Sequence, residues 1–181
     1  MVSEPEMLPV AGARAGEARA WDALFRRYQL PLYTYVAELI RHEQTSLDLV
    51  QETFVSAARH IGTLREDGKF GSWLFGIAHQ KCVQQWRRSR PEHAELDEEC
   101  DAADEAADSP CEVLVRREDE EALMKLLHAL PPPQRSVLLL HFLEDFSLEE
   151  IVEATGAALG TVKSRLHYAK RALRKLLEEQ T

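Results

Sequence analysis

The chain has 181 residues, of which 45% are hydrophobic, so it is long enough for one domain or for two small domains with buried cores. Its formal net charge of -9 at pH 7 would normally argue against a nucleic-acid partner. However, ten of its 31 acidic residues lie between Glu92 and Glu112, where there is no Lys or Arg. Without that stretch, 22 basic and 21 acidic side chains remain, a net charge of +1, so the rest of the chain can carry basic patches.

The sequence also limits compartment and chemistry. Residues 1–20 hold no apolar run of signal-peptide length, and no run approaches the roughly 18 apolar residues of a membrane span. We therefore expect a cytoplasmic protein without membrane insertion. No phosphate loop, nucleophile–base pair or metal-ligand cluster is present in the sequence, so we expect no enzyme activity, no catalytic residue, no cofactor and no metal. His79 and Cys82 are three residues apart and could form a metal pair, but a packed cysteine beside a polar histidine is the favoured interpretation.

The first predicted domain spans residues 15–91 and is helical in pattern throughout. An apolar face begins at Trp21 and continues to Ile40, with a kink or a restart expected at Pro31. A second helix carries an apolar stripe at spacings of 3 and 4, namely Leu47, Val50, Phe54, Ala57 and Ile61. Three glycines between 62 and 71 indicate a loop, and Ser72 is the predicted N-cap of a third helix that ends before Pro91.

A basic and aromatic patch lies on this third helix. Between Gly68 and Arg90 there are five basic residues and no acid, interleaved with the aromatic residues Phe70, Trp73, Phe75 and Trp86. Basic groups that follow a phosphate backbone, with aromatic rings that stack on bases, suit single-stranded or melted DNA. The same aromatic residues could equally be core residues, and the sequence leaves both interpretations open.

Residues 92–117 form the predicted linker. The segment is acidic and rich in alanine, and its few apolar residues could not offset the entropy of ordering it. The second predicted domain spans residues 118–181. It begins with a helix over 122–130, and a second helix starts within Pro131–Pro133, since proline fits the first helical turn.

A helix-turn-helix follows. Ser147 and Glu150 form a capping box for a short helix, and Gly156 suits a left-handed stop. The next helix buries a stripe from Val162 to Leu176, and its other face is basic, with no acid between Leu159 and Lys175. The second helix of such a unit enters the major groove of DNA. The side chains opposite the stripe, which could reach bases or phosphates, are Lys163, Ser164, His167, Tyr168 and Arg171. Arg165, Arg174 and Lys175 are placed for phosphate contacts.

The predicted fold is therefore all-α, with two helical domains joined by an acidic flexible linker and a helix-turn-helix in the C-terminal domain. One more motif is DLVQETF at 48–54, in which Asp48, Gln51 and Glu52 share an outward face. From periodicity alone this is a solvated polar face.

Three motifs together resemble those of the extracytoplasmic-function (ECF, group 4) branch of the sigma-70 family of bacterial RNA polymerase sigma factors. They are DLVQETF at 48–54, FGSWLFGIA at 70–78 with WRR at 86–88, and SLEEI at 147–151 followed by GTVKSRL at 160–166. The resemblance covers about residues 21–177. One departure is His79-Gln80, where the family usually has Arg-Asn.

The resemblance implies a role for each part. Residues 15–91 resemble sigma region 2, which binds core polymerase and recognises and melts the minus-ten element. Residues 118–181 resemble sigma region 4, which recognises the minus-thirty-five element. The implied partners are promoter DNA, the clamp helices and flap of core RNA polymerase, and an anti-sigma factor.

The resemblance also implies three sets of contact residues. The residues that dock on core polymerase are Asp48, Gln51 and Glu52. The minus-ten residues are Lys69, Phe70, Ser72, Trp73, His79, Gln80, Lys81, Arg87 and Arg88. The minus-thirty-five residues are Lys163, Ser164, Arg165, His167, Tyr168 and Arg171.

Two alternatives compete with this interpretation. A DNA-binding regulator with a helical sensor domain would bind its DNA tightly without core polymerase. A module that sequesters a protein partner would use the same helical faces without DNA, and the one-signed charge of residues 162–175 argues against it.

Overall fold

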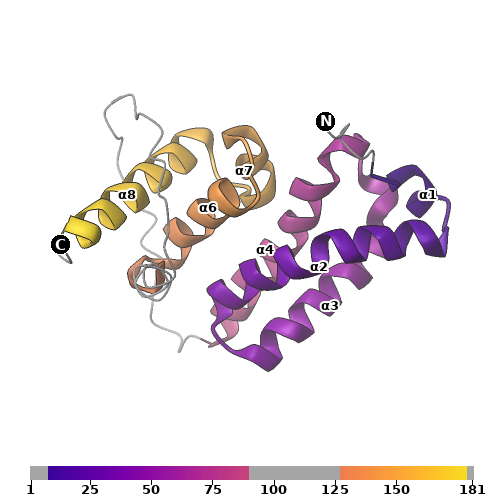
Figure 1. Cartoon of the computed structure of the whole chain (residues 1–181), viewed down its shortest axis with the longest axis horizontal. Helices are drawn as coiled ribbons and strands as arrows, with labels where there is room; N and C mark the ends of the chain where they lie inside the picture. Colours follow the sequence, from indigo (N-terminus) through magenta and orange to yellow (C-terminus); the bar gives the residue numbers. More distant parts are fainter. Residues whose placement is uncertain (1–7, 90–126, 179–181) are drawn as a thin grey trace, which may run out of the picture.

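The computed structural model describes residues 8–89 and 127–178, and within these residues every regular element is helical. The first region, residues 8–89, contains α1 (Val10–Arg14), α2 (Ala18–Ile40), α3 (Glu43–His60) and α4 (Phe70–Ser89). The second region, residues 127–178, contains α6 (Pro132–Leu143), α7 (Leu148–Thr155) and α8 (Leu159–Glu178). Figure 1 shows the two regions side by side. The predicted linker at 92–117 and most of the predicted helix at 122–130 lie outside the described residues.

Of the kink or restart expected at Pro31, the restart does not occur, because α2 continues through Pro31 as one helix. Its length lets one helix supply the inner face of the first region, with Leu24, Leu32 and Val36 fully buried. Pro31 lacks the backbone N–H that would donate within the helix, and the packing of α2 on both α3 and α4 stabilises the helix there. The chain leaves α2 through Arg41, which has a left-handed backbone with φ 59°.

The segment before α4 consists of two short 3-10 turns, Ile61–Thr63 and Asp67–Lys69. Arg14 holds this segment to α1, because its Nη2 donates to the Asp67 carboxylate at 2.7 Å and to the Leu64 carbonyl at 3.1 Å. Helix α4 begins at Phe70, three residues before the start expected after an N-cap at Ser72. Ser72 is therefore not an N-cap, and its hydroxyl donates to the carbonyl of Lys69 at 3.2 Å.

The helix-turn-helix of the second region is confirmed. The Ser147 hydroxyl accepts from the backbone N–H of Glu150, and the Glu150 carboxylate accepts from the backbone N–H of Ser147. Helix α7 ends at Gly156, whose φ of 69° is the left-handed conformation expected of that stop. Helix α6 starts with prolines in its first turn, also as predicted.

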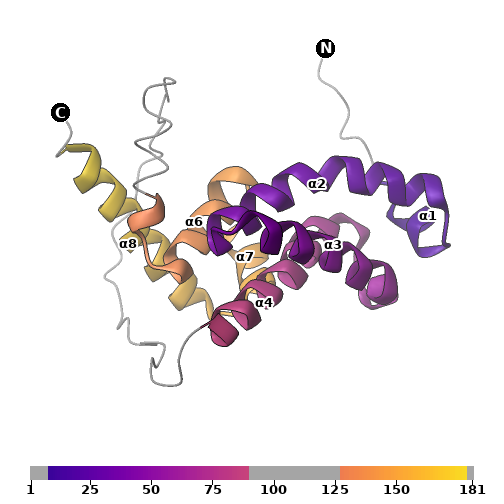
Figure 2. The ribbon, with the colours of Figure 1, turned by 90° about the horizontal axis from the view of Figure 1, so that it is seen from below.

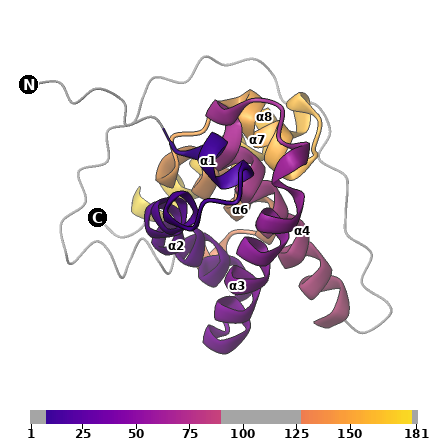
Figure 3. The same ribbon diagram turned by 90° about the vertical axis from the view of Figure 1, so that its right-hand side faces the viewer.

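The two regions pack directly on each other. Helix α4 lies on α7 and α2 lies on α6, while α3 covers the far side of the first region (Figures 2 and 3). The Phe75 and Phe146 rings meet edge to face across this contact, 5.5 Å between centroids. At Gly76, an added Cβ would lie 3.4 Å from Cα of Ala154, so the absence of a side chain lets the helices approach closely. One continuous core results. None of the described helices is both long and apolar enough to cross a membrane.

Candidate nucleic-acid interface

A groove of about 680 Å³ runs along the exposed face of α4. We call it the α4 groove; its lining includes Lys69, Trp73, Gln80, Lys81 and, from α7, Glu153. The half-buried Trp73 ring is braced by Phe70, whose ring centroid lies 5.8 Å away. Amide, ammonium and indole groups thus share one concave surface, which suits a nucleotide strand.

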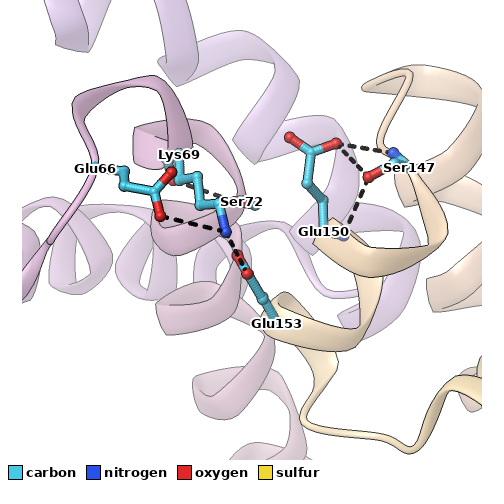
Figure 4. A network of polar contacts seen from close by, with 6 residues as sticks. All are labelled: Glu66, Lys69, Ser72, Ser147, Glu150 and Glu153. Atoms are coloured by element: carbon cyan, nitrogen blue, oxygen red, sulfur yellow. Dashed lines mark hydrogen bonds and ion pairs between the residues drawn. The ribbon is translucent and has the colours of Figure 1, made fainter.

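The two lysines of the α4 groove are both held by carboxylates. Lys69 Nζ lies 2.6 Å from Glu153 and 3.8 Å from Glu66, and the hydrogen bond with Glu153 raises the pKa of Lys69 (Figure 4). Lys81 Nζ lies 3.2 Å from Glu52 on α3. The next basic residues along α4, Arg87 and Arg88, are exposed at its end. The basic face predicted on this helix is therefore present, with its lysines already paired.

Three of the predicted minus-ten residues are buried in this structure and do not line the α4 groove. Phe70 has no exposed surface and packs with Tyr28, 5.5 Å between ring centroids. Ser72 is 2% exposed, and its hydroxyl is used within the first turn of α4. His79 is 8% exposed and lies against the second region. The apolar period of α4 turns these three positions inward, whereas Trp73, Gln80 and Lys81 lie on the groove side.

His79 belongs to a buried polar triad with one residue from each of three helices. Its Nδ1 lies 2.9 Å from the Tyr35 hydroxyl of α2 and 3.2 Å from the Ser136 hydroxyl of α6. The two hydroxyls are 2.8 Å apart. Burial, with a smaller effect of the Arg165 charge, lowers the pKa of His79 to about 4, so the imidazole is neutral at pH 7.

Cys82, one turn further along α4, is fully buried, and its burial raises the pKa of the thiol to about 12. A protonated thiol is a poor metal ligand, and the His79 Nδ1 already faces the hydroxyls of Tyr35 and Ser136. Within residues 8–89 and 127–178, no cluster of three or more His, Cys, Asp or Glu could hold a metal ion.

Helix α8 presents most, but not all, of the predicted base-reading residues. Lys163 and Arg171 are exposed, and His167 and Tyr168 are half-buried with their rings edge to face. Ser164 is the exception, because it is 4% exposed and its hydroxyl donates to the Thr161 carbonyl at 3.0 Å. Ser164 lies beside the buried stripe, and its side chain is too short to reach solvent. Longer side chains at the edge of such a stripe extend past it to the surface.

A second groove lies between α2 and α3, with a volume of about 730 Å³. This α2–α3 groove is lined by apolar side chains that remain exposed, namely Phe25, Leu30, Leu47 and Val55. Leu30 is 69% and Leu47 46% exposed, so Leu47 does not belong to the buried stripe as predicted. Of the three predicted core-docking residues, Gln51 lines this groove. The Asp48 carboxylate accepts a hydrogen bond from Gln44 Nε2 on the same helix. Glu52 instead forms an ion pair with Lys81 of α4.

The apolar residues of the α2–α3 groove were missed as a surface in the sequence. The Phe25 and Phe54 rings are 4.8 Å apart, so Phe25 packs on one side and faces solvent on the other. One signal for it was present in the sequence. Leu47 and Val55 add to the apolar face of α3 that Val50 and Phe54 form, which makes that face too wide to be buried completely. A contiguous exposed apolar patch marks a protein-interaction surface.

Two family models match the chain. "Sigma-70 region 2" matches residues 24–92 and "Sigma-70, region 4" matches residues 120–173. These matches take in the α4 groove, the α2–α3 groove and the helix-turn-helix.

Similar proteins were found in several bacteria. The chain is 32% identical to ECF RNA polymerase sigma factor SigM of Mycobacterium tuberculosis H37Rv, over 97% of this chain and 85% of that protein. It is 31% identical to RNA polymerase sigma factor YlaC of Bacillus subtilis, over 85% of this chain and 90% of that protein. It is 32% identical to ECF RNA polymerase sigma factor BldN of Streptomyces coelicolor over 94% of this chain, and spans 65% of the length of BldN.

Two solved structures share the fold. CnrH, in complex with the cytosolic domain of CnrY, aligns over 97% of this chain and 99% of that chain, with a TM-score of 0.68 and 21% identity. RpoE of Bartonella quintana, in complex with the anti-sigma factor NepR, aligns over 86% of this chain and 96% of that chain, with a TM-score of 0.62 and 23% identity.

Proposed function

The chain belongs to the extracytoplasmic-function branch of the sigma-70 family of RNA polymerase sigma factors. From that premise we propose which of its surfaces binds core polymerase and which bind the two promoter elements. A sigma factor binds core RNA polymerase and directs it to promoters. We assign residues 15–91 to region 2, residues 92–117 to the linker and residues 118–181 to region 4. In this assignment the chain is a specificity subunit and not an enzyme, and it acts in the cytoplasm.

The α4 groove is the proposed minus-ten surface, and it is the observation that carries the proposal. Trp73 offers a ring for an unpaired base, Gln80 offers an amide, and Lys69 and Lys81 offer charge for the strand. Arg87 and Arg88 extend the basic surface toward the end of α4. Phe70 and Ser72 support this surface from below, and His79 supports it from the side of the second region.

Helix α8 is the proposed minus-thirty-five reader. The capping box and Gly156 fix α7 and the turn, so that the N-terminal half of α8 is presented to a major groove. Lys163, His167, Tyr168 and Arg171 supply the base or phosphate contacts, with Arg165 on the phosphates. Ser164 acts within the helix and not on DNA.

The α2–α3 groove is the proposed docking surface for the clamp helices of core polymerase. Gln51 and Asp48 supply polar contacts at an apolar patch centred on Leu30 and Leu47, which is the anatomy of a protein interface. Glu52 contributes by holding Lys81 on the α4 side. The flap is the proposed partner of the second region. We also propose an anti-sigma partner, supported by the fold shared with RpoE, which was solved bound to an anti-sigma factor.

Trp73→Ala tests the central assignment. Stacking of a base on an aromatic ring is worth about 1–3 kcal/mol, so we expect promoter melting to fall about tenfold while core binding is retained. The measurements are permanganate reactivity of the promoter and a pull-down with core polymerase. Arg19→Ala changes an exposed residue of α2 that lines neither groove and should change neither quantity.

Equal loss of melting and core binding would contradict the assignment of Trp73. Tight promoter binding by the chain without core polymerase would instead support the regulator alternative. In vitro transcription with purified core polymerase on a promoter library tests the function as a whole.

A further inference from the structure

One wall of the α4 groove is a loop and not a regular helix. This loop is the 61–69 segment, which joins α3 to α4. It contributes several residues to the groove lining, namely Thr63, Leu64, Arg65, Glu66 and Lys69. Trp73 lines the same groove one turn beyond the end of the segment. A base that stacks on Trp73 therefore lies beside this wall.

The 61–69 segment has little regular structure of its own. Its two 3-10 turns are three residues long each, and such turns have poorer hydrogen-bond geometry than an α-helix. Ile61 and Leu64, each 7% exposed, anchor the first half of the segment in the core. In residues 65–69 every side chain is exposed or half-buried. The second half of the wall therefore depends on polar contacts for its position.

Arg14 of α1 supplies such a contact. Its Nη2 donates to the Asp67 carboxylate at 2.7 Å and to the Leu64 carbonyl at 3.1 Å. These two acceptors lie on either side of Arg65 and Glu66, which belong to the groove lining. A single guanidinium group thus ties down both ends of the exposed stretch between them, and one of its two bonds joins opposite charges.

Helix α1 is itself held firmly in place. Val10 is fully buried, Ala13 is 2% exposed, and the Trp21 indole N–H donates to the Ala13 carbonyl at 3.0 Å. The helix packs on α2 at the end of the first region away from the second region (Figures 1 and 2). Arg14 therefore reaches the loop from a fixed backbone, through contacts that lie within the first region.

We propose that Arg14 is a positioning residue for base selection, which fixes the 61–69 segment and with it the groups that this wall presents to a base in the α4 groove. Bases differ in the arrangement of donors and acceptors on their edges, so a wall discriminates between them only if its own groups keep fixed positions. A wall that moves adapts to any base. Arg14 acts through Asp67 and Leu64 and not on the DNA. This inference rests on the proposed function of the α4 groove.

The first test measures transcription by the holoenzyme from a promoter that it transcribes, and from derivatives in which each minus-ten base is replaced by the other three. Arg14→Ala should lower the discrimination between bases at one or more positions about fivefold, the smaller end of what one good base contact supplies. Core binding in a pull-down should not change. Tm should change little, since the Arg14–Asp67 pair is partly exposed and such pairs contribute little to stability.

Asp67→Ala tests the other partner of the pair. It should lower discrimination at the same position, and the double variant should lose less than the product of the two single losses, because the two side chains form one contact. A double variant that shows the full product overturns the proposal.

Arg19→Ala is the matched control, because it removes the same charge from an exposed arginine of α2 that lines neither groove. It should leave discrimination unchanged. If Arg14→Ala and Arg19→Ala lower discrimination alike, or if Arg14→Ala lowers transcription equally from every promoter, the proposal is overturned.

The second test measures the loop directly, by hydrogen exchange of the full free chain. Arg14→Ala should speed exchange of the backbone amides of residues 65–69 about two- to fivefold, whereas Arg19→Ala should not. Unchanged exchange overturns the proposal.

Trp73→Ala separates this proposal from the proposed function. Unchanged promoter melting with Trp73→Ala would overturn the assignment of the α4 groove. Impaired melting with Trp73→Ala, together with unchanged discrimination with Arg14→Ala, overturns the role of Arg14 and leaves the groove assignment in place.

Discussion

At the scale of single residues, burial decides which of the polar groups can reach a partner. His79 and Trp73 lie on the same helix, six residues apart, and both are in the motif that resembles the minus-ten reader. His79 is 8% exposed and bonded to Tyr35 and Ser136, whereas Trp73 lines the α4 groove. Two residues of one motif therefore have different surroundings: His79 joins the two regions, and Trp73 lies on the proposed DNA surface.

The lowered pKa of His79 predicts a pH dependence of stability. Between the unfolded pKa of 6.5 and the folded value of about 4, the unfolded chain binds more protons, so stability falls as the pH is lowered through this window. The loss is about 3 kcal/mol, from about 2.5 pH units at 1.36 kcal/mol each. Urea unfolding of the unchanged chain and of His79→Gln, at pH 7 and pH 5, should show a shallower dependence in the variant. His60→Gln, at an exposed histidine of α3, should keep the original slope.

Glu144 predicts the opposite trend. Burial raises its pKa to about 7, against the smaller effect of Arg27, so the folded state favours the protonated acid. Stability from this group is complete below pH 4.5 and is lost as the pH rises toward 7. Glu144→Gln should raise Tm at pH 8 and change it little at pH 4.5, as measured by thermal melts. An equal effect of Glu149→Gln at pH 8 would point to total charge instead of burial.

At the scale of elements, capping and loop chemistry determine how α8, the proposed DNA-reading helix, is oriented. The Ser147–Glu150 box starts α7, and Gly156 ends it with a left-handed residue. Since α7 and α8 are joined by a short turn, the orientation of α8 depends on where α7 ends. Local sequence thus sets the geometry of the helix-turn-helix before any contact with the first region.

Ser147→Ala should cost about 1 kcal/mol of stability, because one orphan N–H of α7 loses its acceptor. We expect lower Tm of the full chain and weaker binding of the minus-thirty-five element by the holoenzyme, as measured by footprinting. Ser147→Asp keeps a capping oxygen and should behave as the unchanged chain. A similar loss in both variants would show that the hydroxyl acts through some other contact.

The α2–α3 groove predicts a change in binding without a change in folding. Leu30→Ser removes an exposed apolar side chain, so the folded state loses little, whereas docking of core polymerase should weaken about tenfold. A pull-down and a thermal melt report the two effects separately. Arg19→Ser changes an exposed residue of α2 that lines neither groove and should bind core normally. Equal weakening by the two variants would place the docking surface elsewhere.

At the scale of the whole molecule, Arg135 joins the regions through backbone carbonyls. Its guanidinium donates to Leu127, His128 and Leu130 in the second region and to Glu38 in the first. The His128–Glu38 pair, 2.9 Å apart, lies at the same corner. A planar group with five donors suits four carbonyls, and an ammonium group does not.

Arg135→Lys should therefore lower the free energy of unfolding by about 2 kcal/mol, since at least two hydrogen bonds are lost from a buried site. Fluorescence energy transfer between labels on the two regions should fall as well. Arg59→Lys, at an exposed arginine of α3, should change neither quantity. A stability loss without any change in energy transfer would limit the role of Arg135 to the second region.

The sequence alone determined the helices, the helix-turn-helix and the family, because each depends on periodicity, capping and motifs within short stretches of chain. The apolar stripe of 162–173 and the capping box at Ser147 were confirmed for that reason. Ser72 and Leu47 were wrongly placed, since a helix start and the width of a buried face depend on which neighbours cover them. Only the tertiary structure decided that α7 lies on α4 and that Lys69 meets Glu153, 84 residues away in the chain. Contacts between distant helices depend on shape and burial on both sides, which no local pattern in one helix contains.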